Sequence, residues 1–508
     1  MEVAQLPFRL HTIIMLIGAQ GSRKTQFALE YLMPGLKACE TGAKKINISY
    51  IGFEQVATEF SGGVMPAKGS IELSQITDHV YDSIYSRLRS HTSYPVNSDF
   101  IILDTNGLDS NFRDAILQIA DDNHYNVSVV MFNYDNKAEY TVQNHYEIKQ
   151  VKRLLSGELP FKVFSSVRTL VKSDFDKYQI QVSDYEEVFK YMLPEDGEYV
   201  VIGDVHGCLE ELKETILQHG FIIGADMRVS HPEGKRIVLV GDLIDKGYAI
   251  AEVIDFVYAN IDFFYMTIGN HENFVYKALK GLFDKSSFPS DEIIAEYFGT
   301  YLLLKDYVKP VEPVEPKMPI ELTEMQKYEK RMKEYVGQKK RYDILLSEFE
   351  QYNSLSEDEK KRRKETREKF FKIFESMKSF LVHKDFIVTH APCEKKYLGK
   401  LSDAALKATR DFRYPKMADF NFYSEFFYEF DERVSFLKEE ANDSHPIHIF
   451  GHVMASEVGR FKNKINIDTG CVAHGSLTSV VIKNRKNIII HSVPASFRTH
   501  VAPLYKFF

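Results

Sequence analysis

The sequence VVIGDVHG at residues 200–207 joins a short apolar run to a glycine, an aspartate and a histidine. An apolar run that glycine closes is typical of a strand buried in a parallel sheet. Asp204 and His206 stand two residues apart, so their side chains point the same way from an extended segment. Open α/β sheets bind ligands at the carboxyl ends of their strands. The stretch therefore predicts an α/β fold with a polar site at a strand end.

Five later motifs place polar residues after apolar runs in the same way. They read GDLIDKG at 241–247, GNHE at 269–272, VTHAP at 388–392, FGHV at 450–453 and IDTGCV at 467–472. A single histidine of this kind is more often a core residue than a ligand, but a core does not explain the ordered set. The residues that could converge on one rim are Asp204, His206, Asp242, Asn270, His390 and His452.

The residue types of this set indicate a chemistry. Carboxylates, imidazoles and an amide oxygen suit Mn, Zn, Fe or Ni ions. Two such ions roughly 3.5–4 Å apart can clamp a phosphoryl group and activate an attacking water. The motifs therefore predict a phosphoester hydrolase with two divalent metal ions. Mn²⁺ is the first candidate, and Ni²⁺, Zn²⁺ and Fe are the alternatives.

Residues 197–493 resemble the calcineurin-like metallophosphoesterases. Within them they are similar to the phage-type Ser/Thr phosphatases and to the phosphatase domain of bacterial and phage polynucleotide kinase-phosphatases. The resemblance implies an α/β/β/α sandwich in which Asp204, His206 and Asp242 hold the first ion. It also implies that Asp242 bridges to a second ion, which Asn270, His390 and His452 hold.

The resemblance assigns further residues around the two ions. It implies that His271 is the general acid for the leaving oxygen and that Asp245 orients its imidazole. Asp468 becomes an extra ligand or a substrate organiser. Arg410 matches a phosphate-binding arginine of the family, and Lys246 stands where the family has another arginine. Lysine is a point charge without the bidentate fork of arginine, so we expect phosphate binding with a changed substrate preference.

A second group of motifs lies near the N-terminus. The sequence TIIMLIGAQGSRKTQFALEYL at 12–32 reads as an apolar strand, a glycine-containing turn and a helix. It approximates G-x-x-x-x-G-K-[ST], a loop whose amides cradle phosphates and whose last residue holds Mg²⁺. The residues that would form this loop are Gly18, Gly21, Lys24 and Thr25. Arg23 takes the place of the second glycine, and an ordinary strand, turn and helix is the alternative interpretation.

Residues 10–185 resemble the P-loop kinase module of polynucleotide kinase-phosphatases. The resemblance implies a site for ATP and Mg²⁺, to which Asp104 at the end of an apolar run contributes. It places Glu54 at the position of the base that acts on a 5′-hydroxyl. The arginine that should follow shortly is Ala57 or Thr58 here, which removes a cation that phosphoryl transfer uses.

The same patterns give a domain layout. The P-loop kinase-like domain, with a parallel sheet, covers residues 1–190. The metallophosphoesterase domain covers residues 197–508, and a helical insertion within it is expected at 305–380. The charged run at 357–369 carries both signs. It predicts a solvated helix face, with a nucleic-acid contact as the alternative.

Composition limits the class of protein. The chain has 508 residues, of which 44% are hydrophobic, and a net charge of −8. This charge gives no general attraction to nucleic acid, so any such binding depends on local patches. The cysteines lack paired spacing and suit a reducing compartment; they are Cys39, Cys208, Cys393 and Cys471. No run reaches the roughly 20 apolar residues that span a bilayer. We therefore expect a soluble cytoplasmic protein without a membrane partner.

Together these features favour an enzyme that heals nucleic-acid ends. One domain would remove a 3′-phosphate or a 2′,3′-cyclic phosphate, and the other would phosphorylate a 5′-hydroxyl from ATP. RNA is expected ahead of DNA, and a separate ligase is an expected partner because this chain contains no ligase domain. Two alternatives stay open. One is a protein or small-molecule phosphatase with a relic P-loop domain, and the other is a nucleotide sensor that gates the phosphatase. Sequence indicates nothing about oligomeric state.

Overall fold

The structure is a computed structural model, and it describes most residues of the chain. The described residues are 4–42, 45–134, 144–158, 166–283, 297–305, 353–411, 436–484 and 487–496, with isolated residues between 288 and 350. The chain divides into two compact units. The first comprises Met1–Met192 with Cys393–Thr409, and the second comprises Leu193–Pro392 with Arg410–Phe508.

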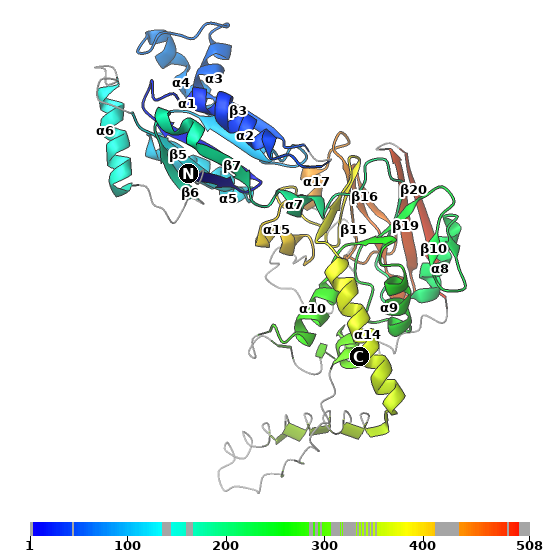
Figure 1. The fold of residues 1–508 in the computed structure, drawn as a ribbon. Coiled ribbons are helices and arrows are strands. Elements are labelled where there is room, and N and C mark those ends of the chain that lie inside the picture. The colour runs from blue at the N-terminus through cyan, green and yellow to red at the C-terminus, as the bar shows by residue number, and fades with distance from the viewer. Residues whose placement is uncertain are drawn as a thin grey trace. The chain divides into compact units, whose positions relative to one another are not determined.

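The first unit is built on a five-stranded sheet in which every pairing is parallel (Figure 1). Its strands, in spatial order, are β3 (Ile48–Gly52), β4 (Phe100–Asp104), β2 (Thr12–Gly18), β5 (Asn126–Phe132) and β6 (Ser166–Leu170). Ile13 and Met15 of β2 pack into one core, whereas Ile14 and Leu16 pack into another. Because both faces of the sheet are buried, its strands read as continuous apolar runs.

Helices follow most of these strands. They are α1 (Lys24–Phe27), α2 (Met33–Ala38), α3 (Phe53–Phe60), α4 (Ile71–His91), α5 (Ser110–Asp122), α6 (His145–Arg153), α7 (Tyr185–Phe189) and α15 (Asp403–Ala408). The side chains of Ser70 and Asp109 accept backbone N–H groups in the first turns of α4 and α5, which fixes where those helices begin. A separate parallel pair is formed by β1 (Ala4–Phe8) and β7 (Tyr178–Val182).

A segment from the second half of the sequence, Cys393–Thr409, packs into the first unit. Its Lys400 side chain is fully buried. The Lys400 Nζ donates to the carbonyl oxygens of Thr92 at 2.7 Å and Asn123 at 3.2 Å. The segment lies inside the residue range expected for the phosphoesterase domain, and no sequence pattern indicated this placement.

The second unit contains two larger sheets. One has the order β12 (Phe264–Met266), β11 (Arg236–Leu239), β8 (Tyr199–Ile202), β19 (Ser476–Asn484) and β18 (Asp468–Thr469), with β20 (Asn487–Pro494) also paired to β19. The other has the order β13 (Phe380–Val382), β14 (Phe386–Thr389), β15 (Ile447–Phe450), β17 (Lys464–Asn466) and β16 (Gly459–Phe461). The pairing of β19 with β20 is antiparallel.

The two sheets pack face to face. Val201 and Val238 of the first sheet share a core with Val388 and Ile449 of the second. Alternate residues of the same strands, such as Ile202, enter a different core that the helices cover. This alternation with period two produces a helix layer and two sheet layers, with the strand ends left to form a rim.

Helices complete the second unit. They are α8 (Leu209–Gln218), α9 (Ile250–Ala259), α10 (Asn270–Leu279), α12 (Gly299–Leu304), α14 (Glu357–Ser376) and α17 (Phe436–Glu440), and a short strand pair is formed by β9 (Ile222–Ile223) and β10 (Val229–Ser230). The charged run forms part of α14. Its Lys369 and Arg362 make ion pairs with Asp255 and Glu252 of α9.

Most of the expected insertion at 305–380 lies outside the described residues, apart from α14 and isolated positions. Within the part of the chain that the structure describes, no helix combines the length and the apolar character that crossing a membrane requires.

Candidate metal centre

The polar motifs of the second unit follow the carboxyl ends of strands in both sheets. Asp204 and His206 follow β8, Asp242 follows β11, and Asn270 begins α10 just after β12. His390 and His452 follow β14 and β15 of the other sheet. These strands run parallel within each sheet, so their ends meet at one rim.

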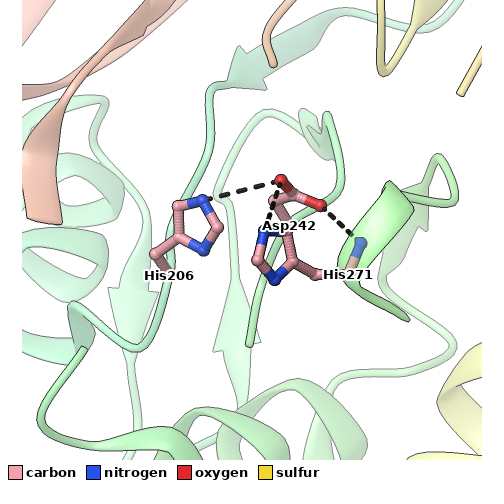
Figure 2. Close-up of side chains that lie close together, drawn as sticks. All are labelled: His206, Asp242 and His271. Atoms are coloured by element: carbon pink, nitrogen blue, oxygen red, sulfur yellow. Dashed lines mark hydrogen bonds and ion pairs between the residues drawn. The ribbon is translucent and has the colours of Figure 1, made fainter. Parts of the chain in front are cut away.

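Asp242 lies at the centre of the cluster (Figure 2). Its Oδ2 lies 3.5 Å from His206 Nε2 and 3.9 Å from His271 Nε2. Its Oδ1 lies 3.4 Å from His390 Nε2 and accepts the backbone N–H of His271 at 3.2 Å. Two groups of donor atoms, one with His206 and His271 and the other with His390 and His452, therefore share this carboxylate. Such sharing suits a carboxylate that bridges two ions.

Asn270 completes the second group. Its Oδ1 lies 3.0 Å from His390 Nε2 and 2.9 Å from His452 Nδ1. An amide oxygen between two imidazoles is the arrangement expected around a cation that all three residues contact.

Backbone carbonyls fix the orientation of two of the histidine rings. The Nδ1–H of His206 donates to the carbonyl of Ile244 at 2.8 Å, and that of His390 donates to the carbonyl of Val240 at 3.0 Å. Because Nδ1 donates in both rings, Nε2 is the nitrogen that faces the cluster, and it can bind a cation once it carries no proton.

Asp204 gives the sharpest test of whether a cation fits here. Its Oδ2 accepts the backbone N–H of His452 at 3.0 Å, but its Oδ1 is buried without a hydrogen-bond partner among the described residues. A Cβ atom at Gly451 would lie 1.9 Å from this oxygen, so glycine is required where the two loops meet. A buried carboxylate oxygen without a donor is costly unless a cation contacts it. The residues present therefore fit a divalent cation.

The pKa values of the cluster residues also favour a bound cation. Burial and the neighbouring Asp468 raise the pKa of Asp204 well above its usual value. Burial acts to raise the pKa of Asp242 as well, but His390 and His271 hold it well below its usual range. Burial opposes protonation of His390, yet Asp242 raises the pKa of that ring to about 10. A bound cation would take over the role of this proton, because imidazole ligands must be neutral.

Asp245 fixes the orientation of the His271 ring by a hydrogen bond to its Nδ1. Its Nδ1 donates to Asp245 Oδ2 at 2.8 Å, which leaves Nε2 directed toward Asp242. Asp245 is fully buried, and its Oδ1 accepts the backbone N–H of Thr300 at 2.7 Å. The Asp245 N–H in turn donates to Thr300 Oγ1 at 3.1 Å. Thr300 lies in the first turn of α12, and no sequence motif indicated its role.

A comparison with known families identifies this arrangement. Residues 198–455 match the sequence profile described as calcineurin-like phosphoesterase, a range of half the chain. This chain belongs to the calcineurin-like phosphoesterase family. The family implies hydrolysis of phosphoesters with divalent metal ions, in accord with the donor groups around Asp242.

Two curated relatives of this calcineurin-like phosphoesterase are both named Bis(5′-nucleosyl)-tetraphosphatase PrpE [asymmetrical]. The protein from Oceanobacillus iheyensis is 26% identical over 301 residues, which are 58% of this chain and 91% of the relative. The protein from Bacillus subtilis is 26% identical over 316 residues, which are 59% of this chain and 95% of the relative. A solved structure described as "Crystal structure of a putative diadenosine tetraphosphatase" covers 60% of this chain and 97% of its own, with 15% identity and a TM-score of 0.33.

Sequence analysis of the phosphoesterase motifs missed the part that Glu272 plays. This carboxylate is fully buried and accepts backbone N–H groups of Asp242 at 2.9 Å, Leu243 at 2.7 Å and Gly269 at 3.1 Å. Burial and the neighbouring Asp242 raise the pKa of Glu272 to about 7. Glu272 thus ties the loop that carries Asp242 to the start of α10. The place of Glu272 in the GNHE motif was the sequence signal that could have indicated this role.

The two expected phosphate-binding residues differ in position. Lys246 Nζ lies 3.1 Å from His206 Nε2, inside the cluster. Arg410 instead pairs with the neighbouring Asp411 through Nε at 3.0 Å and Nη2 at 2.9 Å. Among the described residues, no hydrogen bond or ion pair joins Arg410 to the cluster. Asp468 is buried, and its Oδ1 accepts the N–H of Gly470 at 3.1 Å.

In the first unit, the turn after β2 brings together residues that the sequence singled out. Thr25 Oγ1, in α1, donates at 2.5 Å to Oδ2 of Asp104, the last residue of β4. Lys24 Nζ donates back to the carbonyl of Gly18 at 3.0 Å. Burial lowers the pKa of Lys24, and the carboxylates of Asp104 and Glu147 act against this shift.

The other predicted residues of this unit lie around the same turn. Gly21 has a φ of 84°, and Arg23 has a φ of 66°, in the left-handed region that favours glycine. The backbone at Arg23 therefore has a conformation that glycine adopts without strain. Glu54 is exposed in the first turn of α3, and its charge reaches Lys24.

Proposed function

We propose that this chain heals nucleic-acid ends. In this proposal the phosphoesterase removes a 3′-phosphate or a 2′,3′-cyclic phosphate, and the first unit phosphorylates a 5′-hydroxyl from ATP. The observation that carries the proposal is the pairing, in one chain, of the Asp242-centred cluster with the Lys24, Thr25 and Asp104 contacts of the first unit. Hydrolysis and phosphorylation of ends are complementary steps on one polymer, with RNA as the expected polymer.

The phosphoesterase side of the proposal assigns residues to two ions. Asp204, His206 and Asp242 would hold one ion, with Asp468 as a further donor. Asp242, Asn270, His390 and His452 would hold the other. When bound, the two ions supply electrostatic stabilisation of the phosphoryl group and an activated water. Mn²⁺ is the first metal to test.

His271 is proposed as the proton donor. Because Asp245 accepts the hydrogen bond of Nδ1, a protonated imidazole would present its second proton at Nε2, toward the phosphoryl group. Lys246 is proposed to bind a phosphate oxygen, since its ammonium group already lies in the cluster beside His206.

The kinase side of the proposal rests on the turn after β2. Backbone N–H groups at a helix start favour anions, and in the loop pattern the lysine that corresponds to Lys24 reaches the β- and γ-phosphates of a nucleotide. The contact between Thr25 and Asp104 resembles the pair that holds Mg²⁺ in P-loop enzymes. Glu54 is the proposed base for the 5′-hydroxyl.

A second candidate function is the hydrolysis of dinucleoside polyphosphates. The names of the curated relatives favour it, since both relatives are called bis(5′-nucleosyl)-tetraphosphatases. The same two ions would serve, but the substrate would be a free dinucleotide with a polyphosphate bridge. A phosphoprotein substrate, with the first unit as a nucleotide sensor, is a third outcome that the tests below can return.

The first experiment measures phosphate release from a 3′-phosphorylated RNA oligonucleotide with Mn²⁺. His271→Ala should lower kcat by about 10²–10⁴-fold, because a positioned general acid contributes that factor. Asp242→Ala should abolish release, as should a chelator whose effect Mn²⁺ reverses. Lys24→Ala is the matched control and should keep full release. Release that persists in both cluster variants would refute the assignment of the two-ion site.

The same assay separates the candidate substrates. Wild-type enzyme is offered the oligonucleotide, diadenosine tetraphosphate and a phosphopeptide at equal concentrations. The proposal expects the highest kcat/KM for the oligonucleotide. A higher value for diadenosine tetraphosphate selects the second candidate, and a higher value for the phosphopeptide selects the third.

The second experiment measures transfer of the γ-phosphate of ATP to a 5′-hydroxyl oligonucleotide. Transfer should disappear in Lys24→Ala and persist in His271→Ala, the reciprocal control. Arg23→Gly should keep transfer, because glycine adopts the φ of 66° that this position requires. If the wild-type chain transfers no phosphate to any 5′-hydroxyl end, the kinase half of the proposal is wrong.

A further inference from the structure

Two cysteines and a glutamate form a second buried cluster in the phosphoesterase unit. Cys208 immediately precedes α8, Glu211 lies in its first turn, and Cys471 begins a short 3-10 turn after β18. The thiol sulfurs and a carboxylate oxygen lie within 4.8 Å of one another. The exposed fraction is 0% for Cys208 and 2% for both Glu211 and Cys471. None of these residues belongs to the Asp242-centred cluster.

Among the described residues, the carboxylate of Glu211 contacts only neutral hydrogen-bond donors. Its Oε1 accepts the backbone N–H of Ser496 at 2.8 Å, and the Tyr248 hydroxyl lies 3.5 Å from Oε2. Within the described part of the chain, no lysine, arginine or histidine makes an ion pair with this carboxylate. A buried carboxylate with neutral neighbours alone is costly, and a bound cation removes that cost.

The donor types select the kind of cation. Two thiolates and a carboxylate favour Zn²⁺, whose bonds to cysteine sulfur are about 2.3 Å long. The Asp242-centred cluster offers only imidazole, carboxylate and amide donors, so the two sites differ in chemistry. We propose that Cys208, Glu211 and Cys471 bind a third divalent ion, Zn²⁺, and supply three of its ligands. Binding releases the two thiol protons to solvent and involves no redox step.

The position of this site suggests what the ion does. Cys208 stands two residues after His206, and Cys471 stands three residues after Asp468. The Glu211 carboxylate accepts a hydrogen bond from the backbone N–H of Ser496, just beyond β20. A shared ion would therefore fasten the loop after β8 to the turn after β18 and hold two sets of residues of the catalytic rim at a fixed separation. This role does not depend on which phosphoester is the substrate.

The test detects metal-bound thiolates by absorption spectroscopy. The full-length protein is freed of metal under reducing conditions and reconstituted with Co²⁺. Thiolate bound to Co²⁺ gives a near-ultraviolet charge-transfer absorption that imidazole and carboxylate donors do not give. We expect this absorption in the wild-type chain, together with a third equivalent of metal beyond the two of the catalytic cluster. Zn²⁺ added afterwards should displace the cobalt and remove the band.

Cysteine variants test whether the Co²⁺ charge-transfer absorption arises from Cys208 and Cys471. Cys208→Ser and Cys471→Ser should each lose the absorption and one equivalent of metal, since a serine hydroxyl is a poor substitute for a thiolate. Cys39→Ser is the matched control, because this cysteine lies in the first unit, and it should keep both. Circular dichroism checks that each variant is folded.

Two results would overturn the proposal. One is a wild-type spectrum without thiolate absorption and with only two equivalents of metal, which decides the matter even if the variants fail to fold. The other is a mass spectrum in which Cys208 and Cys471 are joined as a disulfide in protein purified without reductant. Loss of phosphate release with the third equivalent retained would concern the proposed function and leave this site intact.

Discussion

At the scale of single residues, the support around His271 is the least visible part of the site in the sequence. Asp245 orients the imidazole, and Thr300 exchanges two hydrogen bonds with Asp245. Thr300 stands 55 positions after Asp245, in a stretch without a recognisable motif. Its contribution depends on a contact that only folding creates.

Removing the Thr300 hydroxyl should weaken catalysis while leaving binding of the metals intact. Thr300→Val keeps the volume but loses the oxygen that accepts the Asp245 N–H. We expect kcat for phosphate release to fall by about 10-fold, within the range for residues that orient catalytic groups. Metal content, measured on the same samples, should not change.

Thr267→Val provides the control for this substitution. Thr267 is also a fully buried threonine, but its hydroxyl has no hydrogen-bond partner among the described residues. This variant should retain kcat. Equal losses in the two variants would mean that the Thr300 effect is general packing, contrary to the orienting role.

At the scale of elements, Glu272 connects the end of β11 to the start of α10. Three backbone N–H groups, those of Asp242, Leu243 and Ile244, donate to it from one loop. Gly269 donates to it from the turn that precedes α10. One carboxylate thus joins, through hydrogen bonds, the two segments that carry Asp242 and Asn270.

Glu272→Gln should destabilise the phosphoesterase unit even without metal. The glutamine amide turns one acceptor into a donor that faces backbone N–H groups. Loss of hydrogen bonds to a charged group costs about 1.5–3 kcal/mol, so the free energy of unfolding in chelator should fall by that amount at about pH 9, above the Glu272 pKa of about 7. Urea unfolding followed by circular dichroism measures it. Glu365→Gln, an exposed position on α14, should change stability by less than about 0.5 kcal/mol. If Glu272→Gln lowers the free energy of unfolding by less than about 0.5 kcal/mol, Glu272 does not tie the two segments together.

At the scale of the whole molecule, the chain passes from one unit to the other more than once. Segment Cys393–Thr409 begins three residues after His390 and ends one residue before Arg410, yet it packs in the first unit. Its Lys400 is the fully buried anchor of that packing. Residues on both sides of this segment carry predicted roles in the phosphoesterase site.

The anchor should make stability of the first unit depend on pH. Burial lowers the pKa of Lys400 from its usual 10.5 to about 7. Between these values the unfolded chain binds the proton and the folded chain does not, so the free energy of unfolding rises with pH. Below about pH 7 both states are protonated, and the contribution is constant at its lowest value.

Lys400→Met removes this dependence. The stability of the variant relative to the wild type should be greatest near pH 6 and should shrink steadily toward pH 9, by up to about 1.4 kcal/mol per pH unit. Hydrogen exchange in peptides around residues 92–125, corrected for intrinsic rates, measures the difference. Lys407→Met, an exposed lysine of the same segment, should show no such slope. A constant difference across this range would contradict a neutral Lys400.

Much of the catalytic rim could be predicted from the sequence because its residues follow strands directly. An apolar run that ends in glycine and a polar residue places that residue at a strand end, as with Asp204 and Asp242, and parallel strands then bring the ends together. The buried parallel strands β8 and β11 are confirmed for the same reason. The family assignment from these motifs is also confirmed. The kinase identity of the first unit remains a prediction.

The sequence by itself determined which side chains reach the rim, because local strand and turn patterns fix where each polar residue leaves the sheet. Only the tertiary structure decided which of them share Asp242, that Thr300 and Glu272 support them, and that Cys208 meets Cys471 over a buried carboxylate. It also decided that Lys400 belongs to the first unit. Such contacts join residues far apart in the chain. They depend on the packing of whole elements, which leaves no periodic or local signal in the sequence.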